Sequence, residues 1–282
     1  MSGYLYFDGT AGSYASSPHS ASLATITDDF VFEVDIALDS YATANLYFID
    51  KVGGAGQRAY RMYMSAGALI LQWTADGTTV LTIASTALGL TNGTRYTLKG
   101  VFDVDNDAVG KTLTTYIDGV LHNTTLQAAT TSIAVAAGRE LGIMGRTDGT
   151  SQPPGKIYQV RLWSDLAQTA PAFNADFTDL TAAELTAGSF TEDTNGAVVT
   201  INGAAWTYTV VVPDLVGLTV AQAQTLIGSQ LVIVGGTSGV ITAQDLVAGS
   251  LVSAGDTITI TAGSASRMGF TGAIRKPPRR SR

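Results

Sequence analysis

Aromatic and polar side chains gather on two segments of the chain whose pattern predicts neighbouring strands. Tyr60, Tyr63 and Trp73 offer flat ring faces that could stack on sugar rings. Polar side chains near them that could orient sugar hydroxyl groups are Arg58, Arg61, Gln72 and Asp76. Tyrosine and tryptophan at strand spacing more often pack in the core or at a sheet edge than contact a ligand. Stacking on a ligand and packing inside the protein are therefore alternative interpretations of these rings.

A short acidic segment spaces three carboxylates two residues apart, at Asp103, Asp105 and Asp107. Alternating oxygen ligands suit Ca²⁺, a hard cation that takes six to eight of them. The helix–loop–helix form of such a site is excluded, because its sixth and twelfth positions hold Ala108 and Thr114 instead of Gly and Glu. A polar loop is the alternative, and Ca²⁺ is the one cofactor considered for a chain otherwise expected to need none.

Catalytic groups are sparse. Glu33 and Asp35 lie two apart on the polar face of a predicted strand, where a solvated face is the expected role. A glycosidase needs two carboxyl groups facing each other across a cleft. His19 and His122 belong to no Ser/His/Asp order, and the absence of cysteine excludes a thiolate nucleophile. The sequence therefore predicts a protein that is not an enzyme.

The elements that must position these side chains are strands. Residues 30–36 alternate apolar and acidic side chains, which is typical of a half-buried antiparallel strand. Asp-Gly pairs at 76–77 and 118–119 predict hairpins between 68–73 and 78–83 and between 113–117 and 120–122. Further strands are expected over 4–8, 95–102 and 156–163, the last with Tyr158, Val160 and Leu162 on one side. Strands at this spacing indicate a sandwich or jelly roll.

Composition supports this fold and divides the chain electrostatically. The 282 residues include 45% hydrophobic ones, which excludes global disorder, and 31 glycines. Residues 264–282 hold six basic side chains and no acidic one, so the rest carries ten basic against 23 acidic residues, a net charge of −13. An acidic body repels nucleic acid and anionic membranes. No apolar run is long enough to cross a membrane, and no secretory signal is expected at the N-terminus.

Two segments resemble known families. Tyr6-Phe7-Asp8-Gly9-Thr10, the 32–34 strand, the 116–121 hairpin and the 155–163 strand resemble a concanavalin A-like, laminin-G-like jelly roll over 1–165. That family implies glycan binding, glycan cleavage or adhesion. Its glucanases carry Glu-x-Asp-x-x-Glu, whose last position here is Leu38, so the resemblance does not supply a catalytic triad. Its calcium-site Asp on the last strand is Tyr158 here.

Residues 211–263 resemble a PASTA domain. The opening Val-Pro-Asp-Leu-Val-Gly at 212–217 matches, and Thr219 is expected to cap a helix whose apolar stripe is Val220, Ala223, Leu226 and Ile227. Strands are expected at 231–234 and 256–261. The family implies a connection to peptidoglycan, with a spacer as the alternative. A strand-rich bridge over 166–210, with a short helix at 180–185, is expected to pack on the jelly roll. Within it, 176–208 resembles segments of bacteriophage minor tail proteins.

The basic tail at 264–282 is expected to dock into a partner protein. Its candidate docking residues are Arg267, Met268, Phe270, Arg275, Lys276, Arg279, Arg280 and Arg282. The predicted fold class is mostly β, an antiparallel jelly-roll sandwich followed by a small α+β PASTA-like domain. The predicted function is that of a phage virion protein, a minor tail or capsid decoration component, that contacts other virion proteins through its tail and host-surface glycan through the jelly roll. A homo-oligomer, and assembly in the bacterial cytoplasm, are expected. A free peptidoglycan-binding module and a glycan hydrolase are the alternatives.

Overall fold

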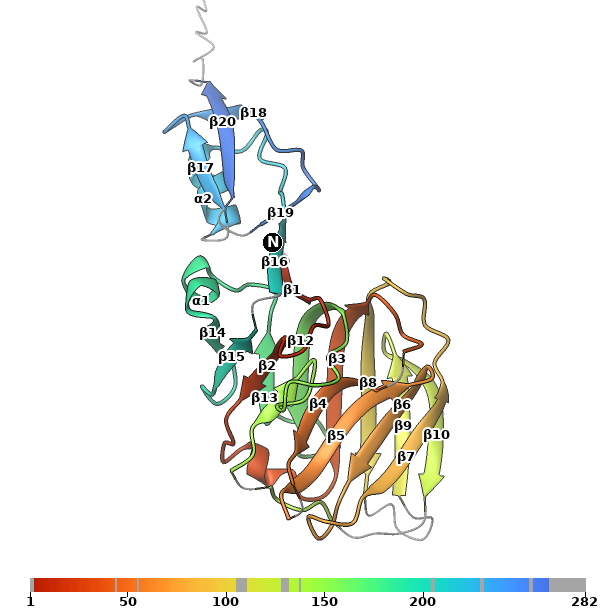
Figure 1. Cartoon of the computed structure of the whole chain (residues 1–282). Coiled ribbons are helices and arrows are strands. Elements are labelled where there is room, and N and C mark those ends of the chain that lie inside the picture. The colour runs from red at the N-terminus through yellow and green to blue at the C-terminus, as the bar shows by residue number, and fades with distance from the viewer. Residues whose placement is uncertain are drawn as a thin grey trace, which may run out of the picture.

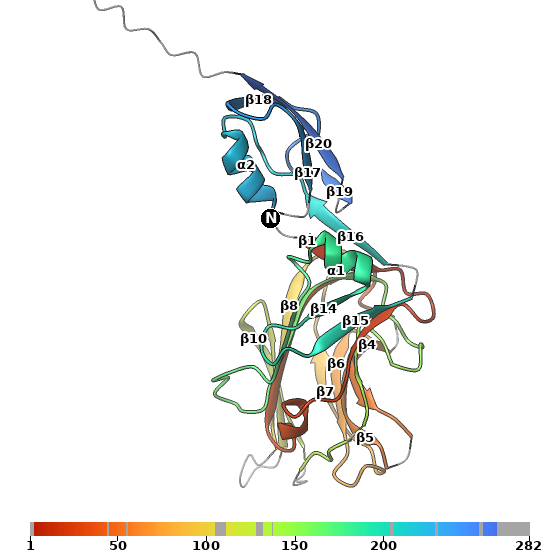
Figure 2. The same cartoon turned by 90° about the vertical axis from the view of Figure 1, so that its left-hand side faces the viewer.

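The computed structural model describes residues 3–43, 45–54, 56–104, 111–127, 132–136, 138–203, 206–228, 231–253 and 256–263. Two large antiparallel sheets, called sheet A and sheet B, face each other in the larger lobe, and a smaller lobe follows at one end (Figure 1). The edge-on view shows the two layers and the smaller lobe above them (Figure 2). This is the mostly β sandwich that the sequence predicts, so the predicted fold class is confirmed.

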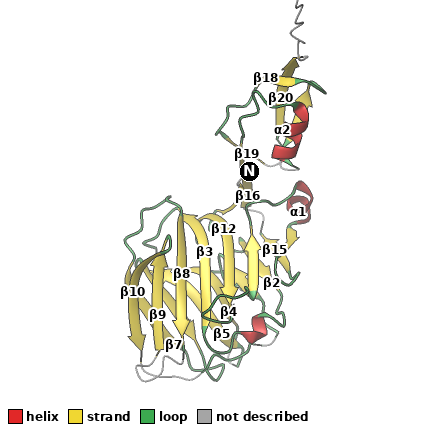
Figure 3. Cartoon of the chain, turned by 180° about the vertical axis from the view of Figure 1, so that it is seen from behind, coloured by secondary structure: helices red, strands yellow, loops and turns green. Residues whose placement is uncertain are grey.

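Sheet A forms the layer that faces the viewer in Figure 3. Its described strands, in spatial order, are β10 (Val120–Gln127), β9 (Lys111–Ile117), β8 (Tyr96–Asp103), β3 (Phe30–Leu38), β12 (Gly155–Trp163), β1 (Gly3–Phe7), β16 (Trp206–Val211) and β19 (Leu251–Ser253), with β13 (Phe173–Asp176) paired to β12. The central pair β3–β12 joins residues 117 to 132 positions apart in the chain. Strands β4, β5, β6, β7 and β11 of sheet B lie between these two partners in the sequence.

Sheet B forms the front layer in Figure 1. Its described strands, in spatial order, are β14 (Ser189–Thr191), β15 (Val198–Asn202), β2 (Tyr14–Ser17), β11 (Leu141–Ile143), β4 (Leu46–Val52), β5 (Arg58–Ser65), β6 (Ala68–Trp73) and β7 (Leu81–Ala87). A single 3₁₀ turn, Leu23–Thr25, precedes β3 in the described chain. The two sheets bury their facing side chains between them, which is how a sandwich builds its core.

Strand β3 shows how alternation sets the faces of sheet A. Phe30, Phe32, Val34 and Ile36 are buried in the core, and the acidic side chains between them lie on the outer face. The expected face of Tyr158 is wrong. The β3–β12 register shifts between Ile157 and Gln159, and such a bulge moves a side chain to the opposite face. Tyr158 therefore packs outside with Tyr4 and Ala37.

The predicted Asp-Gly turns have two outcomes. Asp118 and Gly119 both have positive φ, 49° and 76°, the conformation that a two-residue hairpin loop requires, and they join β9 to β10. The turn at 76–77 also lies between paired strands, but β7 begins at Leu81 rather than at residue 78. Asp76 explains the delay, because its Oδ1 accepts hydrogen bonds from the backbone N–H groups of Thr78 and Thr79, and the chain stays in a turn.

Residues after β12 return to both sheets. Helix α1 (Ala182–Ala187) begins at Thr181, whose side chain forms a capping box with Glu184 and whose hydroxyl accepts from the Glu184 N–H. Strand β15 then pairs with β2 in sheet B, and β16 pairs with β1 in sheet A. The chain between the two lobes thus contributes strands to each sheet of the sandwich.

The smaller lobe packs helix α2 (Val220–Ile227) on a sheet whose strands, in order, are β17 (Val232–Gly235), β20 (Thr257–Gly263) and β18 (Val240–Gln244). Thr219 caps α2 as predicted, in a capping box with Gln222. The expected apolar stripe is wrong at one place: Val220, Ala223 and Ile227 are buried, but Leu226 is 43% exposed. Strand β19 of this lobe pairs with β16 of sheet A, so backbone hydrogen bonds connect the two lobes.

No helix in the described residues is long and apolar enough to span a membrane. Segment 264–282, with all eight predicted docking residues of the tail, lies outside the described residues.

Candidate functional site

Three neighbouring strands of sheet B place a polar row on its outer face. The register pairs Asp50 of β4 with Arg61 of β5, and Arg61 with Gln72 of β6. The adjacent row pairs Tyr47 with Tyr63, whose rings stack with centroids 4.9 Å apart. Because side chains alternate across a sheet, these residues share one face, opposite the core.

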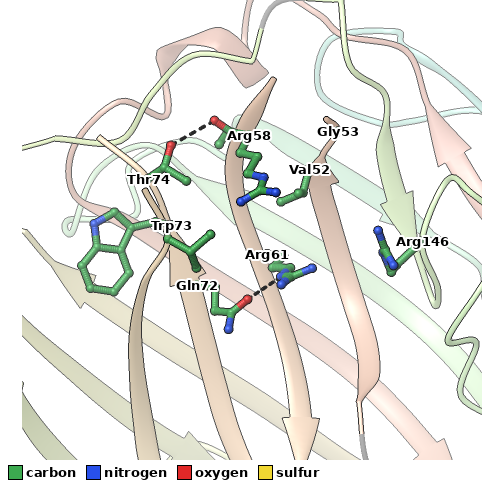
Figure 4. Close-up of a pocket in the computed structure, with 10 residues that line it drawn as sticks. Val52, Gly53, Arg58, Arg61, Gln72, Trp73, Thr74 and Arg146 are labelled. Carbon is green, nitrogen blue, oxygen red and sulfur yellow. Dashed lines mark hydrogen bonds between the residues drawn. The ribbon is translucent and has the colours of Figure 1, made fainter. Parts of the chain in front are cut away.

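A pocket of about 120 Å³ opens beside this row. Its lining residues are Val52, Gly53, Arg58, Ala59, Arg61, Gln72, Trp73, Thr74, Val80 and Arg146. Figure 4 shows Arg58, Arg61 and Gln72 on two adjacent strands, with Arg146 reaching toward them from a separate segment across β4. Pairing of β11 with β4 brings Arg146, three residues after β11, to this face.

Arg61 is held in place by its neighbours. Its Nε donates to Oε1 of Gln72 at 2.6 Å. Its guanidinium carbon lies 5.3 Å from the Tyr47 ring centre and 5.8 Å from that of Tyr63, within cation–π range. The Arg146 guanidinium lies 5.9 Å from the same Tyr47 ring. Two cations therefore flank one stacked tyrosine pair.

Asp50 forms the floor of the row. Its side chain is 1% exposed, and neither carboxylate oxygen has a hydrogen-bond partner among the described residues. Burial raises the pKa of Asp50 to about 6, against the lowering effect of Arg146, Arg61 and Arg139. Nε of Arg146 lies 3.6 Å from Oδ2 of Asp50. The Asp50 carboxylate therefore lies near cations but forms no hydrogen bond with them in the described part of the chain.

The next residue, Lys51, lies against different groups. Its Nζ donates to the carbonyl oxygen of Arg139 at 2.8 Å and lies 2.9 Å from Nδ1 of His19. Burial lowers the pKa of Lys51 to about 8, and burial with the nearby lysine lowers that of His19. His19, for which the sequence offered no catalytic role, is thus a hydrogen-bond partner of a buried lysine.

The prediction of sugar stacking is wrong for two of the three rings, Tyr60 and Trp73. Tyr60 is fully buried and Trp73 is 1% exposed, and both belong to the core between the sheets. Tyr60 pairs with Trp73 in the β5–β6 register, so the two rings share the inner face. Figure 4 shows the Trp73 ring directed away from the arginines. Neither ring can stack on a ligand, because the packing interpretation applies to both.

The other predicted contacts divide. Arg61 and Tyr63 lie on the outer face described above, together with Arg58 and Gln72. Asp76 is exposed, but its carboxylate accepts from both the backbone and the side chain of Thr79, and these bonds hold the pKa of Asp76 well below its usual range. The Asp76 oxygens therefore stabilise the turn in which this residue lies.

The predicted calcium residues are only partly described. Asp103 ends β8, while Asp105 and Asp107 lie outside the described residues. Within the described ranges, no three His, Cys, Asp or Glu side chains form a cluster that could hold a metal ion.

Glu33 and Asp35 lie on the outer face of sheet A, and each forms an ion pair. Arg161 donates to Glu33, and Arg95 donates to both oxygens of Asp35, at 2.8 and 2.5 Å. The Arg95 guanidinium also lies 3.7 Å from the Tyr158 ring centre. On the neighbouring edge, Nε2 of His122 lies 3.0 Å from the Thr86 hydroxyl oxygen.

Sequence reasoning missed Asp50, Arg146 and Tyr47. Asp50 does leave a signal, because it is the single acidic residue in the apolar run LYFIDKV. Arg146 leaves none, since 85 positions separate it from Arg61 and only the pairing of β11 with β4 brings the two together.

Comparison with known proteins identifies the family. The model of the concanavalin A-like lectin/glucanases superfamily matches residues 8–170, and the chain belongs to this superfamily. The PASTA domain model matches residues 210–264, so the predicted pairing of these two modules is confirmed. The chain thus joins a lectin-like jelly roll to a PASTA domain. No curated protein matches it.

Solved structures with a similar fold include three with different origins. A native heptameric SAP-like pentraxin from Limulus polyphemus is 14% identical, with 58% of this chain and 76% of that one covered and a TM-score of 0.40. The CBM40 of the Ruminococcus gnavus IT-sialidase, bound to α2,3-sialyllactose, is 16% identical, covering 55% and 91%, with a TM-score of 0.39. Domains LG4-5 of the mouse laminin α1 chain are 15% identical, covering 58% and 42%, with a TM-score of 0.41.

Proposed function

We propose that this chain is a non-enzymatic adhesion protein that binds glycan on the outer face of sheet B. The observation that carries the proposal is the row of Asp50, Arg61 and Gln72 beside the stacked pair Tyr47 and Tyr63. Sugar hydroxyl groups both donate and accept hydrogen bonds, and this row offers a carboxylate acceptor, guanidinium donors and an amide. A lectin-like fold supplies the scaffold.

The non-enzymatic part of the proposal is supported by the paired state of the one carboxylate couple. A glycosidase needs one carboxyl group that keeps its proton and gives it to the leaving group. Glu33 and Asp35 each form an ion pair with an arginine. Carboxylates held in ion pairs are poorly placed for that task, which makes a glycan hydrolase the weaker alternative.

We also propose that the protein belongs to a bacteriophage virion, as a minor tail or capsid decoration component assembled in the host cytoplasm. Support comes from the sequence: residues 176–208 resemble segments of minor tail proteins, and an acidic body is followed by six basic residues in 264–282. Arginine side chains suit acidic grooves on a partner protein. The tail would dock into other virion proteins, including neighbouring copies of this chain.

The PASTA domain would act as a spacer or as a second contact with the cell wall. Pairing of β19 with β16 continues sheet A into this lobe, which favours a fixed extension over a free linker. A free peptidoglycan-binding module is the alternative to the virion role. The full chain bound to purified peptidoglycan in a pull-down, with no copies in particles, would favour that alternative.

A glycan array with the full chain tests the adhesion function. We expect binding to a subset of bacterial surface glycans, and loss of most of that binding in Arg61→Gln. The matched control is Arg161→Gln, which removes an equivalent arginine from sheet A and should leave binding unchanged. No glycan bound by the wild-type chain would contradict the adhesion function.

Particle composition tests the virion role. Purified particles should contain the full chain by immunoblot, and a chain ending at residue 263 should fold but be missing from particles. Retention of the shortened chain would contradict docking through the tail. Absence of the full chain from particles would contradict the virion role itself while leaving glycan binding untouched.

A further inference from the structure

The pocket on sheet B gathers positive charge on an otherwise acidic protein. Arg58, Arg61 and Arg146 line one pocket of about 120 Å³. Residues 1–263 carry 23 acidic against ten basic side chains. Three of those ten basic side chains therefore line a single pocket. Charge of one sign in a concave site attracts ligands of the opposite sign.

The cations in the pocket are mostly unpaired. Among the described residues, neither Arg58 nor Arg61 has a carboxylate within ion-pair distance, while Arg146 lies 2.8 Å from the half-exposed Asp148 and 3.6 Å from Asp50. Arg58 uses one Nη to donate to the carbonyl oxygen of Thr78. Guanidinium groups present flat forks that match carboxylate and phosphate oxygens. Two such groups are thus held near the pocket without an anion.

Asp50 is not among the residues that line the pocket, but its Oδ2 lies 3.6 Å from Nε of Arg146, which does line it. Asp50 is 1% exposed and lies opposite Arg61 in the β4–β5 register. Neither of its oxygens accepts a hydrogen bond, and Nε of Arg146 donates none, within the described part of the chain. Buried polar groups of a folded protein are normally hydrogen-bonded, so each exception calls for a partner. A hydroxyl group donating to Asp50 would supply one.

These two features select between ligand classes. A free inorganic anion would satisfy the arginines but would be repelled by Asp50 when that group is ionised. A neutral sugar would satisfy Asp50 but leave the arginines without an anion. A sugar that carries both hydroxyl groups and an acidic group satisfies both.

We infer that the ligand of this pocket is an acidic saccharide, whose carboxylate or phosphate lies between Arg58, Arg61 and Arg146 and whose hydroxyl group donates to Asp50. The inference rests on the proposed function, since it names the chemical class of glycan that the outer face of sheet B would take.

Calorimetric or NMR titration of the full chain tests this assignment with D-glucuronate, D-glucose 6-phosphate, D-glucose and inorganic phosphate. We expect at least one acidic sugar to bind about tenfold or more tightly than D-glucose and inorganic phosphate. The ratio of the two acidic sugars distinguishes a carboxylate site from a phosphate site. The acidic-sugar affinity should fall as salt is raised, because the interaction is electrostatic.

Two variants localise the site. Arg61→Gln should weaken acidic-sugar binding about tenfold, more than it weakens D-glucose binding, and Arg61→Lys should recover part of the loss because it restores the charge without the fork. Arg161→Gln is the matched control. Thermal melts establish that each variant is folded.

The outcomes separate this inference from the proposed function. If D-glucose binds as tightly as both acidic sugars, the acidic class is wrong and the adhesion function stands. Inorganic phosphate binding as tightly as the acidic sugars would reduce the pocket to an anion site. Normal binding in Arg61→Gln would move the site elsewhere. If no sugar binds here and none binds on the array, the adhesion function fails as well.

Discussion

The outer faces of the two sheets use the same residue types in opposite ways. On sheet A, Arg95 and Arg161 each meet a carboxylate, and each also packs on an aromatic ring. On sheet B, Arg61 packs on two tyrosines but meets no carboxylate among the described residues, while Asp50 lies buried without a hydrogen bond. These acidic groups of sheet A thus have arginine partners, whereas on sheet B Arg61 has no carboxylate partner and Asp50 has no hydrogen bond among the described residues.

The contrast has a structural cause. The Arg–acid pairs of sheet A lie on one face, where the arginine side chains are 37–47% exposed and can adjust. Asp50 lies on a central strand between β11 and β5, at a depth where solvent cannot replace a missing partner. The same ionisable group therefore stabilises the fold on one face and destabilises it on the other.

The largest expected effect on stability comes from Asp50, because its ionised carboxylate destabilises the fold whereas the paired Asp35 stabilises it. The pKa of Asp50 is raised from 3.8 to about 6 in the folded chain. Between pH 3.8 and about 6, the folded chain therefore keeps a proton on Asp50 that the unfolded chain has released. The free energy of unfolding therefore falls as pH rises through this window, by about 2–3 kcal/mol at about 1.4 kcal/mol per pKa unit. Asp50→Asn should remove this loss, so it stabilises the fold at pH 7.5 and is neutral at pH 4.

Urea unfolding at both pH values measures the effect. The sheet A counterpart, Asp35→Asn, should destabilise at pH 7.5 because it removes the partner of Arg95. A destabilising Asp50→Asn at pH 7.5 would place both faces in the same class and break the comparison.

How much of this could be predicted from the sequence depends on the range of the interactions. The hairpin at Asp118–Gly119 and the alternating strand predicted at 30–36 follow from local residue types, and both are present. The face of Tyr158 depends on a bulge that no local pattern marks. Aromatic residue types alone could not assign Trp73 to the inner face, because on the neighbouring strand Tyr60 lies on the inner face and Tyr63 on the outer one.

Half of the candidate site was predictable for the same reason. Arg61 and Gln72 lie on strands joined by a two-residue turn, so their pairing is local. Seven described strands, β5 to β11, separate Arg146 from Asp50 in the sequence, and the approach of the two residues depends on where β11 enters sheet B. Long-range pairing of this kind is set by the whole fold rather than by spacing in the sequence.

A smaller effect tests whether sheet A is satisfied by its own pairs. Glu33→Gln should lower the free energy of unfolding by about 0.5–1 kcal/mol, the usual range for a solvent-accessible ion pair, since the Arg161 side chain is 37% exposed. In the double variant with Arg161→Gln, the two losses should not add, because both remove one interaction. A double-mutant cycle by urea unfolding measures this coupling. Additive losses would mean that the pair contributes nothing, and Glu140→Gln, an exposed acid, is the control.

The smallest expected effect concerns the exposed carboxylate that competes for Arg146. Asp148 is 46% exposed and pairs with Arg146 at 2.8 Å, while its Oδ1 accepts from the backbone and hydroxyl of Thr150. Asp148→Asn keeps an Oδ1 acceptor for Thr150 but removes the charge. Arg146 would then meet an acidic sugar without its shorter ion-pair partner, and the affinity should rise two- to threefold, about 0.5 kcal/mol, as expected for a screened surface pair.

Titration at low and at high salt checks this expectation, because the gain should disappear when salt screens the pair. Glu33→Gln supplies the comparison on sheet A and should leave the affinity unchanged. If Asp148→Asn lowers the affinity instead, the carboxylate holds Arg146 in its binding position, and sheet B would contain one ion pair that serves the pocket in the way the pairs of sheet A serve the fold.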